Sequence, residues 1–346
     1  MNIVFFVSDH GFGHIMRELP VISYMLRAGQ NITVVCNDKH IELARQYLGD
    51  RPNYIKYHTD AGIVVIPGSI KIDPIKTAKN AEEMIEDYPN RINFAKKILS
   101  DYKIDKVVVD IVPWAIKAAN EYGIESYFMA SFTWLDQYGD YLSSEAHQIY
   151  ERYFRLADNV LYYDLCNKPT RELLGDGIEV GFVAREFDEY KVQEIRKKHK
   201  RKIIYLSLGA SNSGLDFDID VSNLDYDFIT TENFKVIGGN VEYLSIDTPD
   251  TQNYVKAADY CISKPGWTTT AEIMLAGTPV AMIERPDIPE DTMTIEMIEK
   301  RGAGISVGVN ELKNMDKVIE KLEGFRHAST SYKNNYEKIS RLIIGE

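Results

Sequence analysis

The sequence predicts an α/β protein with two doubly wound parallel-sheet domains, and three observations lead to this fold class. Short runs rich in valine and isoleucine alternate with segments that have the apolar period of a helix. These runs lack the apolar–polar alternation of half-exposed strands. The lack of alternation is typical of strands that are buried on both faces of a parallel sheet. The alternation stops near residue 165 and restarts near residue 203, so the 346-residue chain accommodates two such domains.

In the first half, a buried strand over residues 3–7 is followed by a helix whose apolar face carries Ile15, Leu19, Ile22 and Leu26. The other predicted strands are 31–36, 63–66, 106–110, 125–130 and 159–163, and the other predicted helices are 38–48, 78–100 with a break near Pro89, 114–122 and about 136–156.

Residues 165–200 are less regular and lead into the charged run 196–202, which indicates a domain boundary. The predicted strands beyond it are 203–209, 234–239, 241–246, 260–263, 279–284 and 304–307, with helices at 251–258, from residue 268, from residue 291 and in the last 40 residues or so.

The composition excludes several classes of function. The chain has 40 basic and 52 acidic residues, a net charge of −12, which argues against a protein that binds nucleic acid through a basic face. Cys36, Cys166 and Cys261 are far apart and have neither metal-ligand nor disulfide spacing. The apolar start lacks a basic region and no run approaches the ~20 apolar residues of a membrane span. We expect a cytoplasmic protein.

In doubly wound sheets, ligands bind in the crevice beyond the carboxyl ends of the strands. Any chemistry should therefore lie on the loops that follow predicted strands, which singles out four stretches: 8–14, 110–114, 207–214 and 263–269.

In the last of these loops, Lys264, Pro265 and Gly266 form a turn between a strand and a helix that starts among the threonines 268–270. The first turn of a helix offers backbone N–H groups and partial positive charge, and Lys264 adds a cation. The stretch fits a phosphate or diphosphate site, and it equally fits an ordinary strand–turn–helix connection with threonine caps.

The same stretch resembles the donor-binding segment of GT-B glycosyltransferases, especially the UDP-sugar-using family with its "HCGWNSTLEA" pattern. Gly266 and Trp267 match outright, Thr268 and Thr269 stand at the Asn and Ser, and Glu272 falls on the family's glutamate. The resemblance implies that the turn, from Lys264 and Pro265 onward, binds the donor's diphosphate, and that Glu272 binds ribose hydroxyls. Lys264 replaces the family's histidine.

Two flanking segments extend the resemblance. Glu290 and Asp291 fall on the family's Asp-Gln pair, which implies contact with the transferred sugar, although Asp291 also suits a helix N-cap. The stretch 204–214 resembles the strand and loop that open the family's second domain, which implies that Ser207, Gly209 and Ala210 lie near the nucleotide.

The acidic loop 215–227 contains a D-x-D pattern at Asp216, Asp218 and Asp220. This pattern binds a metal–diphosphate pair in a different glycosyltransferase fold, and outside that fold it favours a solvated acidic loop over a metal site. We expect neither a metal nor a cofactor.

The loop "SDHGFGHIMREL" carries the Gly-His pair that precedes the first helix in the family, at Gly13 and His14. There the histidine is the general base, a task that suits imidazole with its ordinary pKa of about 6.5. Asp110 matches the aspartate that orients this histidine, although a helix N-cap is an alternative for it. Gly11 and Gly13 bend the chain so that His14 faces the cleft, and His10 is a bystander.

The resemblance covers residues 1–310 and implies a GT-B fold, in which two domains face one another across a cleft. It implies an acceptor-side domain over 1–165, a connection over 166–200, a nucleotide-sugar-binding domain over 201–327 and a C-terminal helix over 328–346 that returns to the first domain.

Three functions follow from this resemblance. The first is a metal-independent, inverting hexosyltransferase that uses a UDP- or dTDP-type sugar and an unknown hydroxyl acceptor. The second is a nucleotide-sugar hydrolase in which His14 activates water, because "GFGH" followed by Arg17 also resembles the loop of such hydrolases in nonulosonate synthesis. The third is a non-catalytic nucleotide-sugar-binding protein.

Overall fold

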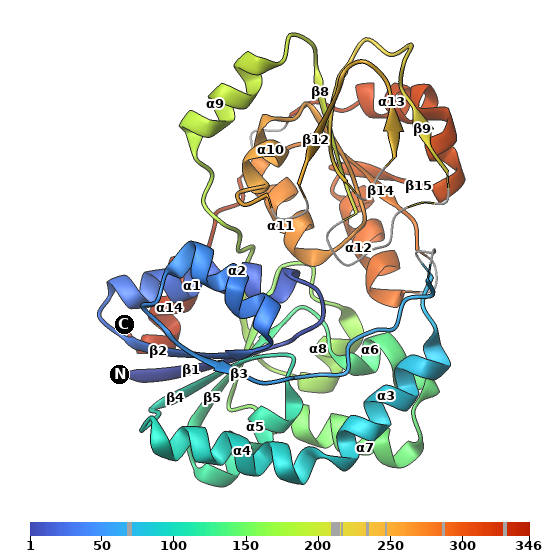
Figure 1. The fold of residues 1–346 in the computed structure, drawn as a ribbon. Helices are drawn as coiled ribbons and strands as arrows, with labels where there is room; N and C mark the ends of the chain where they lie inside the picture. The colour runs from blue at the N-terminus through green and yellow to red at the C-terminus, as the bar shows by residue number, and fades with distance from the viewer. Residues whose placement is uncertain are drawn as a thin grey trace. The chain divides into compact units, whose positions relative to one another are not determined.

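The computed structural model describes residues 1–67, 71–208, 215, 217–232, 235–245, 248–285, 288–327 and 331–346. The chain divides into two compact units, each with its own parallel sheet, so the predicted fold class of two doubly wound α/β domains is confirmed (Figure 1). The first unit comprises residues 1–64, 73–183 and 334–346, and the second comprises 65–72 and 184–333.

The first unit contains a seven-stranded sheet in the order β3-β2-β1-β4-β5-β6-β7, and all of its pairings are parallel. Its strands are β1 (Asn2–Val7), β2 (Asn31–Cys36), β3 (Asn53–Lys56), β4 (Lys106–Asp110), β5 (Glu125–Ala130), β6 (Asn159–Tyr163) and β7 (Ile178–Gly181). The direction of strand succession reverses between β1 and β4, where Val7 pairs with Asp110. This reversal is the switch point at which doubly wound sheets bind ligands.

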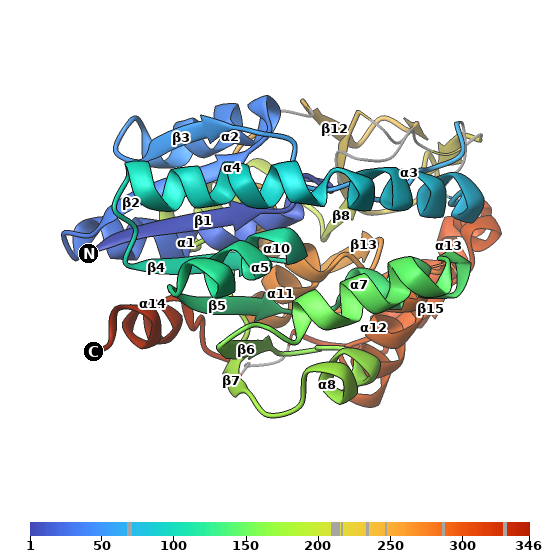
Figure 2. The ribbon, with the colours of Figure 1, turned by 90° about the horizontal axis from the view of Figure 1, so that it is seen from below.

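Helices cover both faces of this sheet, as the order of its strands requires. The helices of the first unit are α1 (Gly13–Arg27), α2 (Asp38–Leu48), α3 (Pro74–Glu86), α4 (Tyr88–Asp101), α5 (Pro113–Tyr122), α6 (Trp134–Tyr138), α7 (Ser144–Phe154), α8 (Lys168–Leu174) and α14 (Tyr336–Ile344), with a 3-10 turn, η1 (Gly139–Tyr141). Figures 1 and 2 show α1, α2 and α14 on one face and α4, α5 and α7 on the other. The strands are therefore buried from both sides, which explains their continuous apolar runs.

The last helix of the chain belongs to the first unit. Ile339 and Ile343 of α14 are buried, and the Ser340 hydroxyl donates a hydrogen bond of 3.2 Å to the Val21 carbonyl of α1. The contact lies beside Pro20, which has no backbone N–H group and therefore donates no backbone hydrogen bond inside α1.

The second unit contains a six-stranded sheet in the order β12-β10-β8-β13-β14-β15, and its pairings are also all parallel. Its strands are β8 (Ile203–Ser207), β10 (Asp227–Thr231), β12 (Val241–Leu244), β13 (Tyr260–Ser263), β14 (Val280–Ile283) and β15 (Gly304–Val307). The succession reverses between β8 and β13, where Ser207 pairs with Ser263. The switch point of this sheet thus lies between the loops after residues 207 and 263.

The second unit has its own set of helices and a small additional sheet. Its helices are α9 (Glu189–Lys198), α10 (Gln252–Ala257), α11 (Trp267–Ala276), α12 (Pro289–Lys300) and α13 (Met315–Glu323), with a 3-10 segment, η2 (Val309–Asn314). The strands β9 (Ile219–Asp220) and β11 (Val236–Ile237) form a small parallel sheet. Ile219 and Val236 of this sheet belong to the same hydrophobic core as Leu206 of β8 and Leu322 of α13. Strand β9 lies in the acidic loop 215–227, and β11 lies in the predicted strand 234–239.

Several predicted elements differ from those observed. The run 63–66 forms no strand but only an isolated antiparallel bridge from Val65 to Ile72, and the third strand along the chain is β3 instead. Strand β10 was not predicted. Residues 166–183, interpreted as a connection, contain α8 and β7, which completes the first sheet. Every helix in the described ranges is too short or too polar to span a lipid bilayer.

Candidate active site

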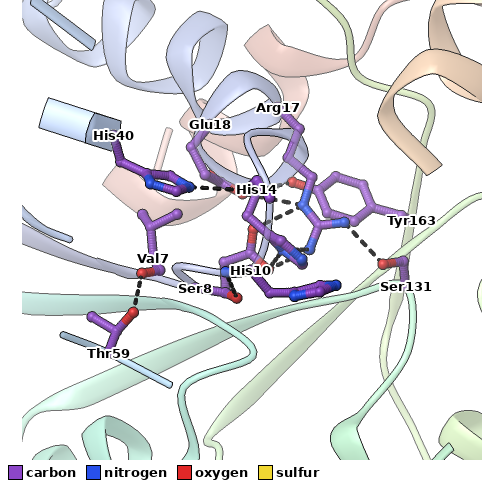
Figure 3. Close-up of polar contacts among 12 residues, drawn as sticks. Val7, Ser8, His10, His14, Arg17, Glu18, His40, Thr59, Ser131 and Tyr163 are labelled. Carbon is purple, nitrogen blue, oxygen red and sulfur yellow. Dashed lines mark hydrogen bonds and ion pairs between the residues drawn. The ribbon is translucent and has the colours of Figure 1, made fainter. Parts of the chain in front are cut away.

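The switch point of the first sheet brings together side chains from four strand ends and the first turns of α1. The loop after β1 leads into α1 at Gly13, and His14, Arg17 and Glu18 share one buried face because they are three and four residues apart. Figure 3 shows these side chains pointing toward the ends of neighbouring strands.

His14 and Asp110, the predicted base and its orienting carboxylate, are in contact. The His14 Nδ1 atom lies 2.9 Å from Asp110 Oδ1, and the two residues are 6% and 1% exposed. Phe132 packs its ring against the imidazole, with centroids 5.9 Å apart. A proton on Nδ1 bonded to Asp110 leaves Nε2 as the ring nitrogen that can accept a proton.

Arg17 is a central member of the same cluster. Its Nε donates to Asp110 Oδ2 at 2.8 Å, its Nη2 forms an ion pair with Asp110 Oδ1, and its Nη1 donates to Ser131 Oγ at 2.9 Å. The Nη2 atom also lies 3.1 Å from His14 Nδ1. The guanidinium therefore binds the carboxylate with two nitrogens while touching the imidazole that the carboxylate orients.

Glu18 and Tyr163 close the cluster on the side of β6. The Tyr163 hydroxyl donates to Glu18 Oε1 at 3.0 Å, and the Arg17 guanidinium lies 5.0 Å above the Tyr163 ring. Burial, reinforced by the negative charge of Asp110, raises the pKa of Glu18 to about 8. Glu18 is therefore mostly protonated at neutral pH.

The remaining ionisations follow from burial and charge. Burial raises the pKa of Asp110, but Arg17 and His14 outweigh it and bring that pKa to about 2. Burial lowers the pKa of His14; Asp110 opposes this effect, and Arg17 adds to it. The site thus contains an ionised Asp110 beside a neutral imidazole, the state required of a general base.

The rest of the 8–14 loop is structural. Gly11 has a φ of +66°, which favours glycine, and its carbonyl accepts a hydrogen bond of 2.8 Å from His40 Nε2. His10 Nδ1 accepts a hydrogen bond of 3.1 Å from the Ile63 N–H, and a Cβ on Gly62 would come within 2.8 Å of that nitrogen. His10 therefore braces the 60–63 segment, and its expected lack of a catalytic role stays a prediction.

The second unit places the predicted diphosphate segment at its own switch point. Helix α11 starts at Trp267, and its N-cap, Gly266, supplies no side-chain cap. Pro265 and Trp267 are buried, whereas Thr268 and Thr269 are partly exposed at the first turn. Partly exposed hydroxyls at a helix start without a side-chain cap are compatible with anion binding.

Lys264 lies close to three charged residues at the end of β14 and the start of α12. Burial and the nearby Arg285 lower the pKa of Lys264 to about 8, while Asp291 and Glu290 oppose the shift. Arg285 forms a buried ion pair with Asp291. Asp291 is the third residue of α12 and Ile288 is its N-cap, so the alternative role of Asp291 as an N-cap is wrong.

Glu272, predicted to bind ribose, is 2% exposed and bonded to Arg185. Its Oε1 accepts from Arg185 Nη2 at 2.8 Å and Nε at 3.1 Å, and Nη2 also donates to Thr251 Oγ1 at 3.0 Å. The carboxylate is therefore fixed within its own unit, and its role toward ribose stays a prediction.

Some predicted site residues lie outside the described ranges, namely Gly209, Ala210 and Asp216 of the D-x-D pattern. Ser207 ends β8 and is 7% exposed. The Asp220 carboxylate accepts a hydrogen bond of 2.9 Å from the Ser222 N–H. Within the described part of the chain, no group of three or more His, Cys, Asp or Glu side chains is arranged to hold a metal ion.

Sequence reasoning missed five residues of these clusters: Glu18, Ser131, Tyr163, Arg185 and Arg285. Two signals were available for the first unit. Glu18 lies four residues after His14 on a predicted helix, and Ser131 and Tyr163 stand at the ends of predicted strands. No comparable signal marked the two arginines of the second unit.

Comparison with known proteins bears on the fold. The glycotransferase of kitacinnamycin aligns over 99% of this chain and 98% of its own, with a TM-score of 0.63 and 15% identity. CalG4, the calicheamicin glycosyltransferase, aligns over 99% and 94%, with a TM-score of 0.64 and 12% identity. These similarities show the shared fold.

Residues 1–127 match the family model described as glycosyl transferase family 1, and residues 194–343 match the C-terminal domain of glycosyltransferase family 28. Each half of the chain thus matches a glycosyltransferase family model, and the fold is that of GT-B glycosyltransferases. The two cluster-bearing sheets thus correspond to the two halves of a GT-B glycosyltransferase.

Two relatives of this GT-B chain are similar over most of its length. L-arabinokinase of Arabidopsis thaliana is 24% identical over 88% of this chain, which spans only 30% of that longer protein. An uncharacterized glycosyltransferase of Methanosarcina mazei is 24% identical over 88% of this chain and 85% of its own.

Proposed function

We propose that the chain is an inverting glycosyltransferase that moves a sugar from a UDP- or dTDP-type donor to a hydroxyl acceptor. The observation that carries the proposal is the buried His14–Asp110 contact at the switch point of the first sheet, in a chain with the GT-B fold. A neutral imidazole oriented by an ionised carboxylate is the arrangement needed to deprotonate a weak nucleophile.

In the reaction, an acceptor hydroxyl donates its proton to His14 Nε2 as its oxygen attacks the anomeric carbon of the donor sugar. The bond from that carbon to the diphosphate oxygen breaks, and the nucleoside diphosphate leaves with the electron pair. Asp110 holds the Nδ1 proton and stabilises the imidazolium that forms. A single displacement inverts the anomeric configuration.

The departing diphosphate requires positive charge, and the switch point of the second sheet supplies it. The N-terminal dipole of α11 and the ammonium of Lys264 are suited to two phosphates. Lys264, Pro265, Gly266, Thr268 and Thr269 are the residues that we assign to the diphosphate. Glu290 and Asp291 are assigned to the donor sugar, and Glu272 to the ribose.

A second candidate is hydrolysis of the nucleotide sugar, with water in place of the acceptor hydroxyl. Arg17, which completes the resemblance to nucleotide-sugar hydrolases, contacts both His14 and Asp110, and this contact favours keeping the candidate. The chemistry at His14 is the same in both cases, so the nucleophile alone distinguishes them.

The test is nucleotide release from a panel of UDP- and dTDP-hexoses, each incubated with and without a cell extract as the source of acceptors. We expect release that depends on the extract. Equal nucleotide release in buffer alone would contradict the transferase and support the hydrolase. Donor binding without release under any condition would contradict both enzymes and leave a nucleotide-sugar-binding protein.

A further inference from the structure

The contacts around His14 differ from a simple histidine–aspartate pair, because Asp110 has a second buried partner. Arg17 holds both carboxylate oxygens, Oδ2 through Nε at 2.8 Å and Oδ1 through Nη2, and Oδ1 is also the oxygen that His14 contacts. Histidine and arginine therefore share one carboxylate oxygen.

Arg17 is held in this place from several sides. It is 1% exposed, its Nη1 donates to Ser131 Oγ at 2.9 Å, and its guanidinium lies over the ring of Tyr163. An arginine fixed by hydrogen bonds and stacking keeps its charge in one position, and Arg17 stays protonated at any accessible pH. Its Nη2 is 3.1 Å from His14 Nδ1, so that charge acts directly on the imidazole.

We propose that Arg17 is a positioning residue that clamps the Asp110 carboxylate for His14 and, through its fixed charge, opposes protonation of the imidazole. The inference rests on the proposed role of His14 as a base. The clamp keeps Asp110 ionised and oriented, and the positive charge keeps His14 unprotonated and ready to accept a proton below neutral pH.

Of the other titratable groups around His14, His40 alone acts on its pKa in the same direction as Arg17 among the described residues. Asp110, at the end of β4, favours the imidazolium, and His40 of α2 disfavours it more weakly than Arg17 does. Glu18 of α1 is mostly protonated, and burial keeps the pKa of Tyr163, at the end of β6, well above its usual range. Arg17 is therefore the nearest fixed positive charge that acts on His14 among the described residues.

A nuclear magnetic resonance titration of the histidine rings tests the inference without any substrate. The His14 signal is assigned by its loss in His14→Gln. In the wild-type chain, we expect the His14 midpoint to lie below the ordinary value of about 6.5. A midpoint above this value would overturn the inference, because Asp110 would then outweigh burial and Arg17 together.

Variants give the matched comparison. Arg17→Gln removes the charge, and we expect the His14 midpoint to rise by on the order of one to two pH units, the effect of one charge about 4 Å away in a partly screened interior. Arg27→Gln, at the exposed end of the same helix, should leave it unchanged. His58, bonded to Asp9 at 2.9 Å, is the internal reference. An unchanged midpoint in folded Arg17→Gln would overturn the inference.

Arg17→Lys separates charge from geometry. Lysine keeps the charge but cannot hold both carboxylate oxygens in one plane, so we expect a midpoint within about 0.5 of wild type together with a lower turnover rate. A midpoint as high as in Arg17→Gln would contradict the electrostatic role. Because the titration requires no turnover, its failure is distinguishable from a failure of His14 to act as the base.

Discussion

Asp60 offers a quantitative test of how burial acts near the candidate active site. This side chain is 4% exposed, and neither carboxylate oxygen has a donor in full hydrogen-bond geometry among the described residues, although Ser8 lies close enough to oppose the shift of its pKa. Burial raises its pKa from 3.8 to about 7; Ser8 and His58 work against the shift, and Asp9 and Asp110 add to it. We predict that Asp60→Asn stabilises the first unit in a strongly pH-dependent way.

The sign follows from proton binding. The folded state binds a proton at Asp60 more tightly than the unfolded state does, so this contribution is fully present below pH 3.8 and is lost as the pH rises through about 7. Between pH 5 and pH 8, the wild-type unfolding free energy should therefore fall by roughly 2.5 kcal/mol through this residue alone. Asparagine has a similar shape and no such proton, so the loss disappears.

The assay is urea unfolding at pH 5 and pH 8, followed by tryptophan fluorescence in a Trp267→Phe background. The two remaining tryptophans, Trp114 and Trp134, then report on the first unit, and Trp114 Nε1 donates to the Thr59 carbonyl at 2.8 Å. The stabilisation by Asp60→Asn should be larger at pH 8 than at pH 5 by about 2.5 kcal/mol. Asp140→Asn, on the surface of the same unit, is the control.

A difference below about 0.5 kcal/mol between the two pH values would refute the reasoning, because it would mean that Asp60 is solvated or paired in the folded chain. Equal destabilisation at both pH values would refute it as well, since it would assign Asp60 a hydrogen bond that the structure lacks.

Three further predictions concern other parts of the two units. Glu272→Gln should lower the unfolding free energy of the second unit by about 3–5 kcal/mol in urea titrations, because the buried Arg185 charge loses its carboxylate counter-charge; an unchanged value would contradict the pair. Lys264→Met should weaken UDP binding at pH 7, as measured by calorimetry. It should also remove the decline in UDP affinity that we expect for wild type above pH 8, where Lys264 loses its proton. Equal UDP affinities of wild type and Lys264→Met at pH 7 would contradict the assignment of Lys264 to the diphosphate site. Gly11→Ala should cost about 1–2 kcal/mol of stability because of its positive φ, whereas Gly239→Ala, with open space around it, should be neutral in thermal unfolding.

The two sheets were predictable from the sequence because strands buried on both faces leave continuous apolar runs. The same signal misled at residues 63–66, whose apolar run forms only the Val65–Ile72 bridge. The strand β3 has the half-exposed sequence "NYIK" because an edge strand has one neighbour and fewer buried side chains. Apolar runs thus identified most strands of both sheets, but missed the edge strands β3 and β7 and the internal strand β10.

The contact of His14 with Asp110 follows from a general rule, since Asp110 ends β4, His14 lies in the first turn of the helix that follows β1, and these two strands adjoin at the switch point. The partners that fix charge were not predictable. Arg17 lies on the expected helix face, but helical spacing does not say that it binds Asp110. Arg185 meets Glu272 from 87 residues away, a pairing that only the folded second unit creates.

The central claim is that His14 removes the proton of the attacking hydroxyl, and one comparison tests it most directly. Acceptor-dependent nucleotide release by wild type and His14→Ala is measured beside the donor affinity of each, with His10→Gln as the control from the same loop. We predict that His14→Ala lowers turnover by at least about 100-fold while the donor Kd changes less than about twofold, and that His10→Gln stays near wild type. Full retained turnover in His14→Ala would contradict the account.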